Sequence, residues 1–580
     1  MSAGTVILGI SAGTGHDSGA ALLVDNTLVA ACEEERISRI KHDGGFPSRS
    51  IAYCLNAARV TPEDVSHVAV GLHPWAAPWR RLGFLTDMGL SSHLARKAMF
   101  LRREALGLFR IGNELRRQFP RARVVFVEHH LAHAASAFFC SPFEEAAVLT
   151  MDGHGEWATG LVGHGQGSHL DKLAEAFFPE SLGLVYLAFT HYLGFDTHDE
   201  YKVMGLSAYG EPEYLEIVRR IIRFDPGRIY RVDLSWIQHP AYTACPWGRH
   251  YYSDKLTKIF GPARQPGATV STLHKNLAKS LQVALEEVGV AIARHLRART
   301  KSGKLVLAGG VCLNGLMNYA IKASGAFENI FVQPASNDGG IALGAALHVN
   351  HQVLGNPRSF VMQHAYWGPG FSEEEIRREL ETCRLPYVRL ADPARVAAEL
   401  IAGNHIIGWF QGRSELGPRA LGNRSILADP RDPKNKDRVN ARIKFREEFR
   451  PFAPSVLAEH ASAYFDGLNE SSYMLMICPV CPEMRSVIPA VVHVDGTARP
   501  QTVNRDTNPR YYVLIEHFHR ITGVPVVLNT SFNVKGEPLV NSPTDAIRCF
   551  FSTGLDYLVM GDCLLYKGPL PDNILKTVSS

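Results

Sequence analysis

The chain has 580 residues, more than the roughly 250–300 at which a single hydrophobic core stops growing, so we expect two domains. Hydrophobic residues make up 46% and charged residues 20%, as in ordinary soluble globular proteins. The formal net charge is only +4, and no basic domain or tail of the kind that a dedicated DNA-binding chain carries is present.

The N-terminus and the cysteines both favour a cytoplasmic protein. The first seventeen residues show no basic segment followed by a long apolar stretch, and no run reaches the roughly 18 apolar residues of a membrane span. Among ten cysteines only Cys478 and Cys481 form a CxxC, without a second CxxC to complete a zinc site. We therefore expect reduced thiols and no membrane association.

Strand and helix patterns alternate through the first 350 residues. Asp25-Asn26 separates two of the strand patterns and predicts a hairpin. Helical spacing of apolar residues is clearest over Thr272–Thr300. The remaining elements are strands at 6–10, 20–24, 27–31, 123–127, 147–151, 304–308 and 330–333, and a helix at 341–349. This alternation indicates an α/β fold, in which ligands bind beyond the carboxyl ends of strands.

The pattern breaks at 351–370, a stretch rich in proline and glycine. Ser372 and Glu375 then have the spacing of a capping box that opens a helix. We place the domain boundary here, with a first domain at 1–360 and a second α/β domain at 371–580.

Two histidines and two acids are candidate metal ligands. His129 and His133 lie four residues apart and share a helix face, although His130 also shares a face with His133. Asp152 and Asp338 each follow a predicted strand and precede glycine. Two imidazoles and two carboxylates suit iron(II), zinc or manganese.

Two further turns are candidate sites for catalysis and nucleotide binding. His16, in a glycine-rich turn after the first strand, can act as a neutral base or merely make a local hydrogen bond. Gly309-Gly310 ends another strand ahead of a helix that includes Asn314, and such a helix N-terminus binds phosphate well. A tight strand-to-helix turn is the simpler interpretation of these glycines.

Basic residues gather between Arg413 and Arg450. Arg419, Arg450 and Arg499 lie in rigid settings among glycine, proline and apolar residues, where a purely solvated side chain is not expected. Arginines held in this way are suited to binding phosphate or carboxylate. Asn529 and Ser531 add amide and hydroxyl groups after a predicted strand.

The chain resembles the carbamoyltransferases of the NodU/CmcH type over nearly its full length. The strings that carry the resemblance include HDSGAALL, HHLAHAASAF, TMDGHGE, EYKVMGLSAYG, GGVCLN, GRSELGPRALGNRSILADPR, FREEFRPFAPSVL, DGTARPQTV and NTSFNVKGEPLV. SNDGG departs from the usual wording of its loop but keeps the aspartate. The resemblance implies a first domain with the actin-like (ASKHA) fold of the tRNA threonylcarbamoyltransferase and a YrdC-like second domain.

The resemblance also implies a role for each candidate residue. The second domain would make carbamoyladenylate from carbamoyl phosphate and ATP, with magnesium accompanying the ATP. In the first domain, His16 would be the general base and an iron(II)-type ion would be the metal, held by His129, His133, Asp152 and Asp338. Gly153, Gly309, Gly310 and Asn314 would hold the adenylate, and Arg419, Lys444, Arg450, Arg499, Asn529 and Ser531 would hold carbamoyl phosphate and ATP.

The expected reaction is O-carbamoylation of a small hydroxylated natural product, without a nucleic-acid partner. The alternatives are N-carbamoyl or threonylcarbamoyl transfer, a non-catalytic nucleotide-binding regulatory protein, and an actin-like sugar kinase. The weak net charge argues against tRNA, and a kinase leaves the second domain unexplained. Residues around 75–120 and 225–265 are expected to contact the acceptor, whose identity the sequence leaves open, as it does the oligomeric state.

Overall fold

The computed structural model describes residues 4–13, 15–76, 109–239, 250–447 and 449–570. The chain forms two compact units. The first takes residues up to Glu34 and from His42 to Met362; the second takes Gln363 onward together with Glu35–Lys41. The sequence predicts a contiguous first domain at 1–360; the structure differs at 35–41, because this short segment packs with the second unit.

The first unit contains two five-stranded sheets with the same topology. In each sheet the central strand pairs antiparallel with one neighbour, which pairs antiparallel with the edge strand beyond it. On its other side the central strand pairs parallel with a neighbour, which pairs parallel with the other edge strand. One sheet has the order β3-β2-β1-β4-β5, with β1 (Val6–Ser11), β2 (Gly19–Val24), β3 (Thr27–Glu33), β4 (His67–Val70) and β5 (Arg123–Phe126). The other has the order β8-β7-β6-β11-β12, with β6 (Glu145–Met151), β7 (Ala158–Gln166), β8 (His169–Phe177), β11 (Lys304–Ala308) and β12 (Asn329–Val332).

The predicted hairpin forms between β2 and β3. Asp25 and Asn26 both adopt positive φ, 46° and 69°, as a two-residue hairpin turn requires and as these residue types tolerate. The strand at 304–308 and the helix α10 (Thr272–Thr300) form where the sequence predicts them.

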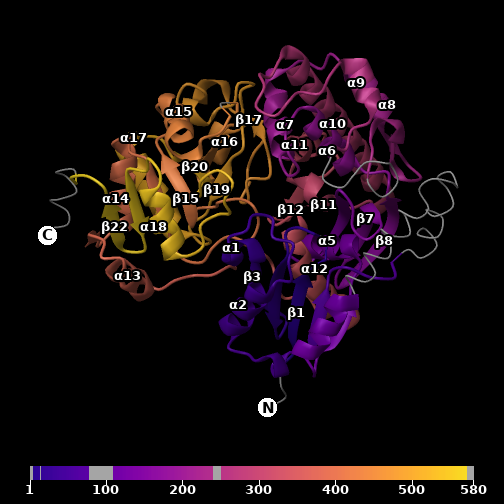
Figure 1. Ribbon diagram of the computed structural model, residues 1–580, viewed down its shortest axis with the longest axis horizontal. Coiled ribbons are helices and arrows are strands. Elements are labelled where there is room, and N and C mark those ends of the chain that lie inside the picture. Colours follow the sequence, from indigo (N-terminus) through magenta and orange to yellow (C-terminus); the bar gives the residue numbers. More distant parts are fainter. Residues whose placement is uncertain (1–3, 14, 77–108, 240–249, 448, 571–580) are drawn as a thin grey trace. The chain divides into compact units, whose positions relative to one another are not determined.

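Two helices lie between the sheets of the first unit. Helix α12 (Ile341–His348) packs on β1, β2 and β4, and helix α5 (His129–Phe138) packs on β6, β7 and β11. The two helices also pack against each other, and Figure 1 shows them side by side. Close contact is possible because Gly344 of α12 faces the backbone of Ala132, leaving no space for a larger side chain. The start of each helix therefore lies near strand ends.

Further helices complete the first unit. Helix α10 packs against α11 and α8, while β9 and β10 form a separate two-stranded sheet. The bounds of these elements are α2 (Ser48–Ala58), α6 (Leu182–Tyr192), α7 (Glu200–Leu206), α8 (Leu215–Ile221), β9 (Ile222–Asp225), β10 (Ile229–Val232), α9 (Asp254–Phe260) and α11 (Gly315–Ala323).

The second unit is built on a mixed eight-stranded sheet of order β13-β22-β21-β14-β15-β20-β16-β19. Its strands are β13 (Tyr387–Arg389), β14 (Ile407–Phe410), β15 (Arg424–Ala428), β16 (Ala453–Leu457), β19 (Gln501–Val503), β20 (Val526–Ser531), β21 (Tyr557–Met560) and β22 (Cys563–Tyr566), and β17 (Cys478–Pro479) pairs separately with β18 (Thr497–Ala498). Its helices are α1 (Glu34–Ser38, of which Glu34 belongs to the first unit), α13 (Glu373–Thr382), α14 (Pro393–Ala402), α15 (Lys434–Val439), α16 (Ala461–Tyr464), α17 (Pro509–Thr522) and α18 (Pro543–Phe551).

Both units are thus α/β, and the capping box at Ser372 and Glu375 opens α13 as predicted. In the described part of the chain, none of the helices has both the length and the apolar character that crossing a membrane requires.

Candidate metal centre and cation cluster

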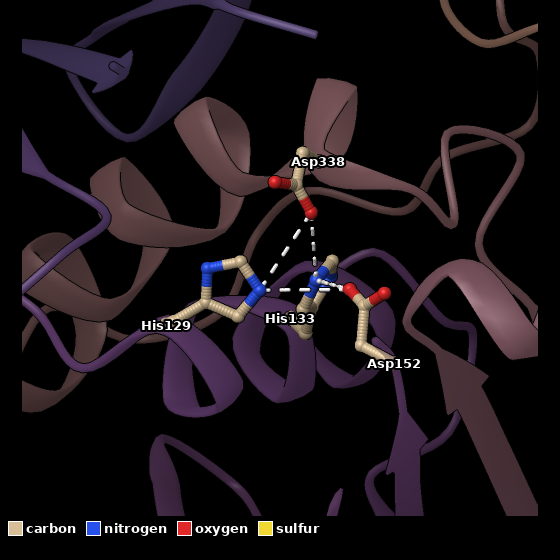
Figure 2. A group of neighbouring side chains, drawn as sticks. All are labelled: His129, His133, Asp152 and Asp338. Atoms are coloured by element: carbon tan, nitrogen blue, oxygen red, sulfur yellow. Dashed lines mark hydrogen bonds and ion pairs between the residues drawn. The ribbon is translucent and has the colours of Figure 1, made fainter. Parts of the chain in front are cut away.

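Four side chains of the first unit converge on one point (Figure 2). His129 and His133 project from α5, Asp152 follows the last residue of β6, and Asp338 opens the short helical turn before α12. One nitrogen or oxygen atom from each lies within 4.8 Å of the others. We call these four residues the metal-ligand cluster.

The distances within the metal-ligand cluster fit a bound metal ion. From Nε2 of His133, Oδ2 of Asp152 lies 3.0 Å away and Oδ1 of Asp338 lies 3.6 Å away. From Nε2 of His129 to the same two oxygens, the distances are 3.5 and 3.6 Å. Ligand atoms each about 2.1 Å from one ion lie about 3.0–3.4 Å apart. A divalent ion therefore fits this donor set with little movement.

Burial and charge also fit a cation. The side chains of His129 and His133 are fully buried, and those of Asp338 and Asp152 are 4% and 15% exposed. Two buried carboxylates require compensating charge. Burial by itself lowers the pKa of His133, but hydrogen bonds and negative charge from the two aspartates outweigh it and raise the pKa to about 9. The negative charge of the same two aspartates would also stabilise a bound metal ion.

The structure distinguishes His129 from His130. His130 is buried, and its Nδ1 is hydrogen-bonded to Oγ1 of Thr150 at 2.7 Å, away from the metal-ligand cluster. Nε2 of His129 instead faces the carboxylates of Asp152 and Asp338, as expected of an atom that shares a metal ion with them. Geometry thus selects His129, a choice that helical spacing alone left open.

Sequence reasoning assigned no role to Glu156 and Gly155, which hold His129 in place. The carboxylate of Glu156 accepts the backbone N–H of His129, the first residue of α5, at 3.0 Å, and also that of His73. A Cβ atom on Gly155 would lie 2.7 Å from Cβ and Cγ of His129. Both belong to the string DGHGE after β6, where a glycine and an acid close to a candidate ligand were the available signal.

His16 lies at the edge of the metal-ligand cluster. Its Nδ1 is 3.8 Å from Oδ2 of Asp338 and 3.5 Å from Oδ2 of Asp17, and its side chain is 39% exposed. Burial lowers its pKa, but the charges of Asp338 and Asp17 more than compensate and hold the pKa above the ordinary histidine value. A neutral imidazole at this position therefore requires that a cation offset the carboxylate charge.

The predicted adenylate-binding residues differ in how tightly they are packed. Gly309 has a φ of 92°, and a Cβ atom there would lie 2.2 Å from the Met151 carbonyl oxygen. At Gly310 it would lie 2.9 Å from Oδ1 of Asp152, whereas at Gly153 it would meet nothing within 4 Å. The strand at 304–308 continues into a short helical turn, Gly310–Leu313, before the α-helix.

Asn314 precedes α11 as its N-cap rather than lying within the helix. Its side-chain oxygen accepts the backbone N–H of Met317 at 3.0 Å, and its amide group donates to Gln282 at 2.8 Å. Its role toward a nucleotide stays a prediction.

Five cationic side chains of the second unit are linked by charge repulsion: three of them act on Arg499, and two of those three also act on Lys444. We call them the cation cluster: Arg419, Lys444, Arg446, Arg450 and Arg499. Burial, and then repulsion from Arg419, Arg446 and Arg450, hold the pKa of Arg499 well below the ordinary arginine value. A guanidinium stays charged in proteins, so the repulsion is a cost that a bound anion would relieve.

Lys444 connects the cation cluster to the end of β20. Its ammonium group donates to Oγ of Ser531 at 3.1 Å and to Oδ1 of Asn533 at 2.8 Å. Burial, and then repulsion from Arg446 and Arg450, hold its pKa well below the ordinary lysine value. The predicted pair of Lys444 and Ser531 is thus in direct contact.

The other polar residues around the cation cluster have structural partners. The buried amide of Asn529 donates to Oγ of Ser455 at 3.0 Å and to the Ala420 carbonyl at 3.3 Å, so it supports the segment beside Arg419. Arg424 is fully buried, with its guanidinium carbon 3.7 Å from the centre of the Phe410 ring. Much of the basic stretch that the sequence displays is therefore architectural.

Arg446 belongs to the cation cluster although sequence reasoning did not select it. Its Nε donates to Oδ1 of Asn440 at 3.0 Å, and its guanidinium carbon lies 4.4 Å from the centre of the Phe452 ring. Arg446 lies in the basic stretch but lacks the glycine and proline neighbours by which Arg419, Arg450 and Arg499 were chosen as candidate anion ligands.

The predicted acceptor-binding stretches lie partly outside the described residues, at 77–108 and 240–249.

Residues 6–347 match the family model described as carbamoyltransferase N-terminus, and residues 398–567 match carbamoyltransferase C-terminus. Nodulation protein NolNO of Sinorhizobium fredii is 41% identical over 95% of this chain and 79% of its own length. An uncharacterised Synechocystis protein is 40% identical over 98% of this chain and 97% of its own.

A relative of named activity and a solved structure complete the comparison. The 3'-hydroxymethylcephem-O-carbamoyltransferase of Streptomyces clavuligerus is 28% identical over 94% of this chain and 97% of its own. Among solved structures, component A of the Acidaminococcus fermentans (R)-2-hydroxyglutaryl-CoA dehydratase aligns with a TM-score of 0.30 and 16% identity over 59% of this chain and 97% of that one.

Proposed function

Because the chain belongs to the carbamoyltransferase family and is a carbamoyltransferase, we propose that it makes carbamoyladenylate from carbamoyl phosphate and ATP and transfers the carbamoyl group to a hydroxyl of a small natural product. The observation that carries the proposal is the pairing, in one chain, of a metal-ligand cluster in one unit with a cation cluster in the other. The cation cluster alone would serve only donor activation, and the metal-ligand cluster alone would serve only carbamoyl transfer.

The second unit activates the donor. The half-reaction balances as carbamoyl phosphate, ATP and water giving carbamoyladenylate, phosphate and pyrophosphate. Water first cleaves carbamoyl phosphate into carbamate and phosphate. A carbamate oxygen then attacks the α-phosphorus of ATP, and pyrophosphate leaves. Arg419, Arg450 and Arg499 bind the phosphate groups, and their mutual repulsion favours a polyanion between them. Lys444 and Ser531, already in contact, present an ammonium and a hydroxyl to the same anions.

The first unit transfers the carbamoyl group. The acceptor hydroxyl attacks the carbamoyl carbon, its proton passes to His16, and AMP leaves. Gly309 and Gly310 bring backbone close to the adenylate beside Asp152. A divalent iron, zinc or manganese ion held by the metal-ligand cluster would supply Lewis-acid polarisation of the carbonyl or the phosphate. The repeated sheet topology supports the actin-like fold that the resemblance implies for this unit.

An O-linked acceptor is favoured because a relative that matches over nearly the full chain is named for carbamoylation of a hydroxymethyl group. The test is incubation of the full chain with ATP, carbamoyl phosphate and a panel of hydroxylated metabolites, read by mass. We expect a carbamoyl gain on a hydroxyl that requires both co-substrates. A gain only on amines, or a phosphoryl gain, would contradict the proposal.

A further inference from the structure

Residues Glu35–Lys41 fold as part of the second unit although both chain neighbours belong to the first. On one side, the carboxylate of Glu34 accepts the backbone N–H and the hydroxyl of Ser50 at 2.8 and 2.7 Å, at the start of α2. On the other side, His42 is hydrogen-bonded to Asp17 at 2.8 Å. The segment is therefore fixed at both ends rather than a loose loop.

Arg36 is the most deeply buried cation of this segment, with 2% of its surface exposed. Its guanidinium donates a hydrogen bond of 2.5 Å to the carbonyl oxygen of Gly417. Gly417 has a φ of 99°, which a residue with a side chain rarely adopts, and Arg419 of the cation cluster follows two residues later. The hydrogen bond thus holds the backbone at the turn that presents Arg419.

Arg39 makes a similar contact with a second loop. Its guanidinium donates to the carbonyl oxygens of Leu539 and Pro538 at 2.5 and 3.0 Å, and it pairs with Asp545 at 3.3 Å. This loop follows β20, the strand that ends on Ser531. Two arginines from one short segment therefore hold the turn that precedes Arg419 and the loop that follows Ser531, whose hydroxyl is bonded to Lys444.

We propose that Arg36 is a positioning residue of the donor site: it fixes the turn at Gly417 so that Arg419 reaches the phosphate groups of the donor. The proposal rests on the donor-activating role proposed for the second unit. Arg36 itself is occupied by the backbone carbonyl and acts through Arg419. Because an ionic hydrogen bond to a buried carbonyl is strong, its loss frees the turn and misplaces a charge that must meet phosphate closely.

A purely structural arginine offers a matched control. Arg358, in the first unit, is half-buried and donates to the carbonyl oxygens of Ser141 and Phe138 at 2.7 and 3.1 Å. Replacing it by alanine removes the same kind of backbone contact in the unit that does not contain the cation cluster. We expect Arg358→Ala to lower the melting temperature without altering the affinity for carbamoyl phosphate.

The test uses the full chain with Arg36→Ala, Arg36→Lys and Arg358→Ala. Pyrophosphate release gives kcat and KM for carbamoyl phosphate, and calorimetry gives the affinity for carbamoyl phosphate alone. For Arg36→Ala we expect KM and the dissociation constant to rise about tenfold or more, since a hydrogen bond to a charged group is worth about 1.5–3 kcal/mol. Arg36→Lys, which keeps one charged donor, should recover part of the loss.

The outcomes separate this inference from the proposed function. A lower melting temperature with unchanged KM and affinity in Arg36→Ala would overturn it, because the contact would then be structural only. If Arg36→Ala does not fold, Arg36→Met, which keeps the length of the side chain but not the donor, takes its place, and a wild-type affinity in Arg36→Met would overturn the inference equally. If the wild-type chain binds carbamoyl phosphate but releases no pyrophosphate, the donor-activation proposal fails, and weaker binding by Arg36→Ala still supports the positioning role.

Discussion

Nε2 of His133 lies 3.0 Å from Oδ2 of Asp152, although one belongs to a helix and the other to the end of a strand. The contact brings α5 and β6 to a common point, which Asp338 reaches from the turn before α12. Each of these elements is largely apolar and buried, so the ligands are carried by rigid parts of the core.

Replacing His133 by alanine should remove the metal. One imidazole is lost from a set of four ligands, and two carboxylates are left with a single buried histidine. Elemental analysis of the purified protein should show most of the metal gone. His130→Asn is the control, because His130 lies on the same helix but bonds to Thr150. Full metal occupancy in His133→Ala would reject this residue as a ligand.

Gly155 and Gly153 allow a sharper test of the packing around His129. A methyl group at 155 would lie 2.7 Å from the His129 side chain and must displace it, whereas a methyl group at 153 meets nothing within 4 Å. We expect Gly155→Ala to lower metal affinity about 10- to 100-fold, the range seen when the support of a ligand is disturbed. Metal content should be normal in Gly153→Ala, and equal metal loss in both variants would contradict this account.

His16→Asn should separate the two half-reactions. The variant loses the group that takes the acceptor proton, while the cation cluster in the other unit is untouched. We expect pyrophosphate release at close to the wild-type rate and carbamoyl transfer reduced about 100-fold or more, as general-base removal usually causes. The two rates are measured in the same reaction mixture. A parallel fall in both would show that the division of labour is wrong.

Arg450→Ala should abolish pyrophosphate release that depends on ATP and carbamoyl phosphate. The variant removes one of the charges gathered around Arg499 and Lys444. Arg431→Ala is the matched control, since Arg431 lies in the same basic stretch but pairs with Asp429 at 2.6 Å. Unchanged release in Arg450→Ala would remove this arginine from the anion site.

Much of the local structure follows from the sequence because it depends on local chemistry. The helix at 272–300 and the strand at 304–308 have clear periodicity and clear ends, and Asp25-Asn26 specifies its turn. Each candidate ligand follows or opens such an element, so its position near a sheet edge could be predicted.

Other features depend on contacts between distant parts of the chain and could not be predicted. The two sheets of the first unit share a topology without a visible sequence repeat, because buried strands need only apolar residues of suitable size. Helical spacing could not separate His129 from His130, since the separation depends on the carboxylates that His129 faces and on the hydrogen bond of His130 to Thr150. Likewise, the sequence around Arg36 does not indicate that the side chain donates a hydrogen bond to the carbonyl oxygen of Gly417.

The most direct test of the central claim follows the α-phosphate of ATP. The full chain is incubated with α-labelled ATP, carbamoyl phosphate and an acceptor, and the labelled products are separated. We predict that the label appears as AMP, with one pyrophosphate released and one carbamoyl group transferred for each AMP formed. Label recovered as ADP, or carbamoyl transfer that proceeds without ATP, would contradict activation of the donor as carbamoyladenylate.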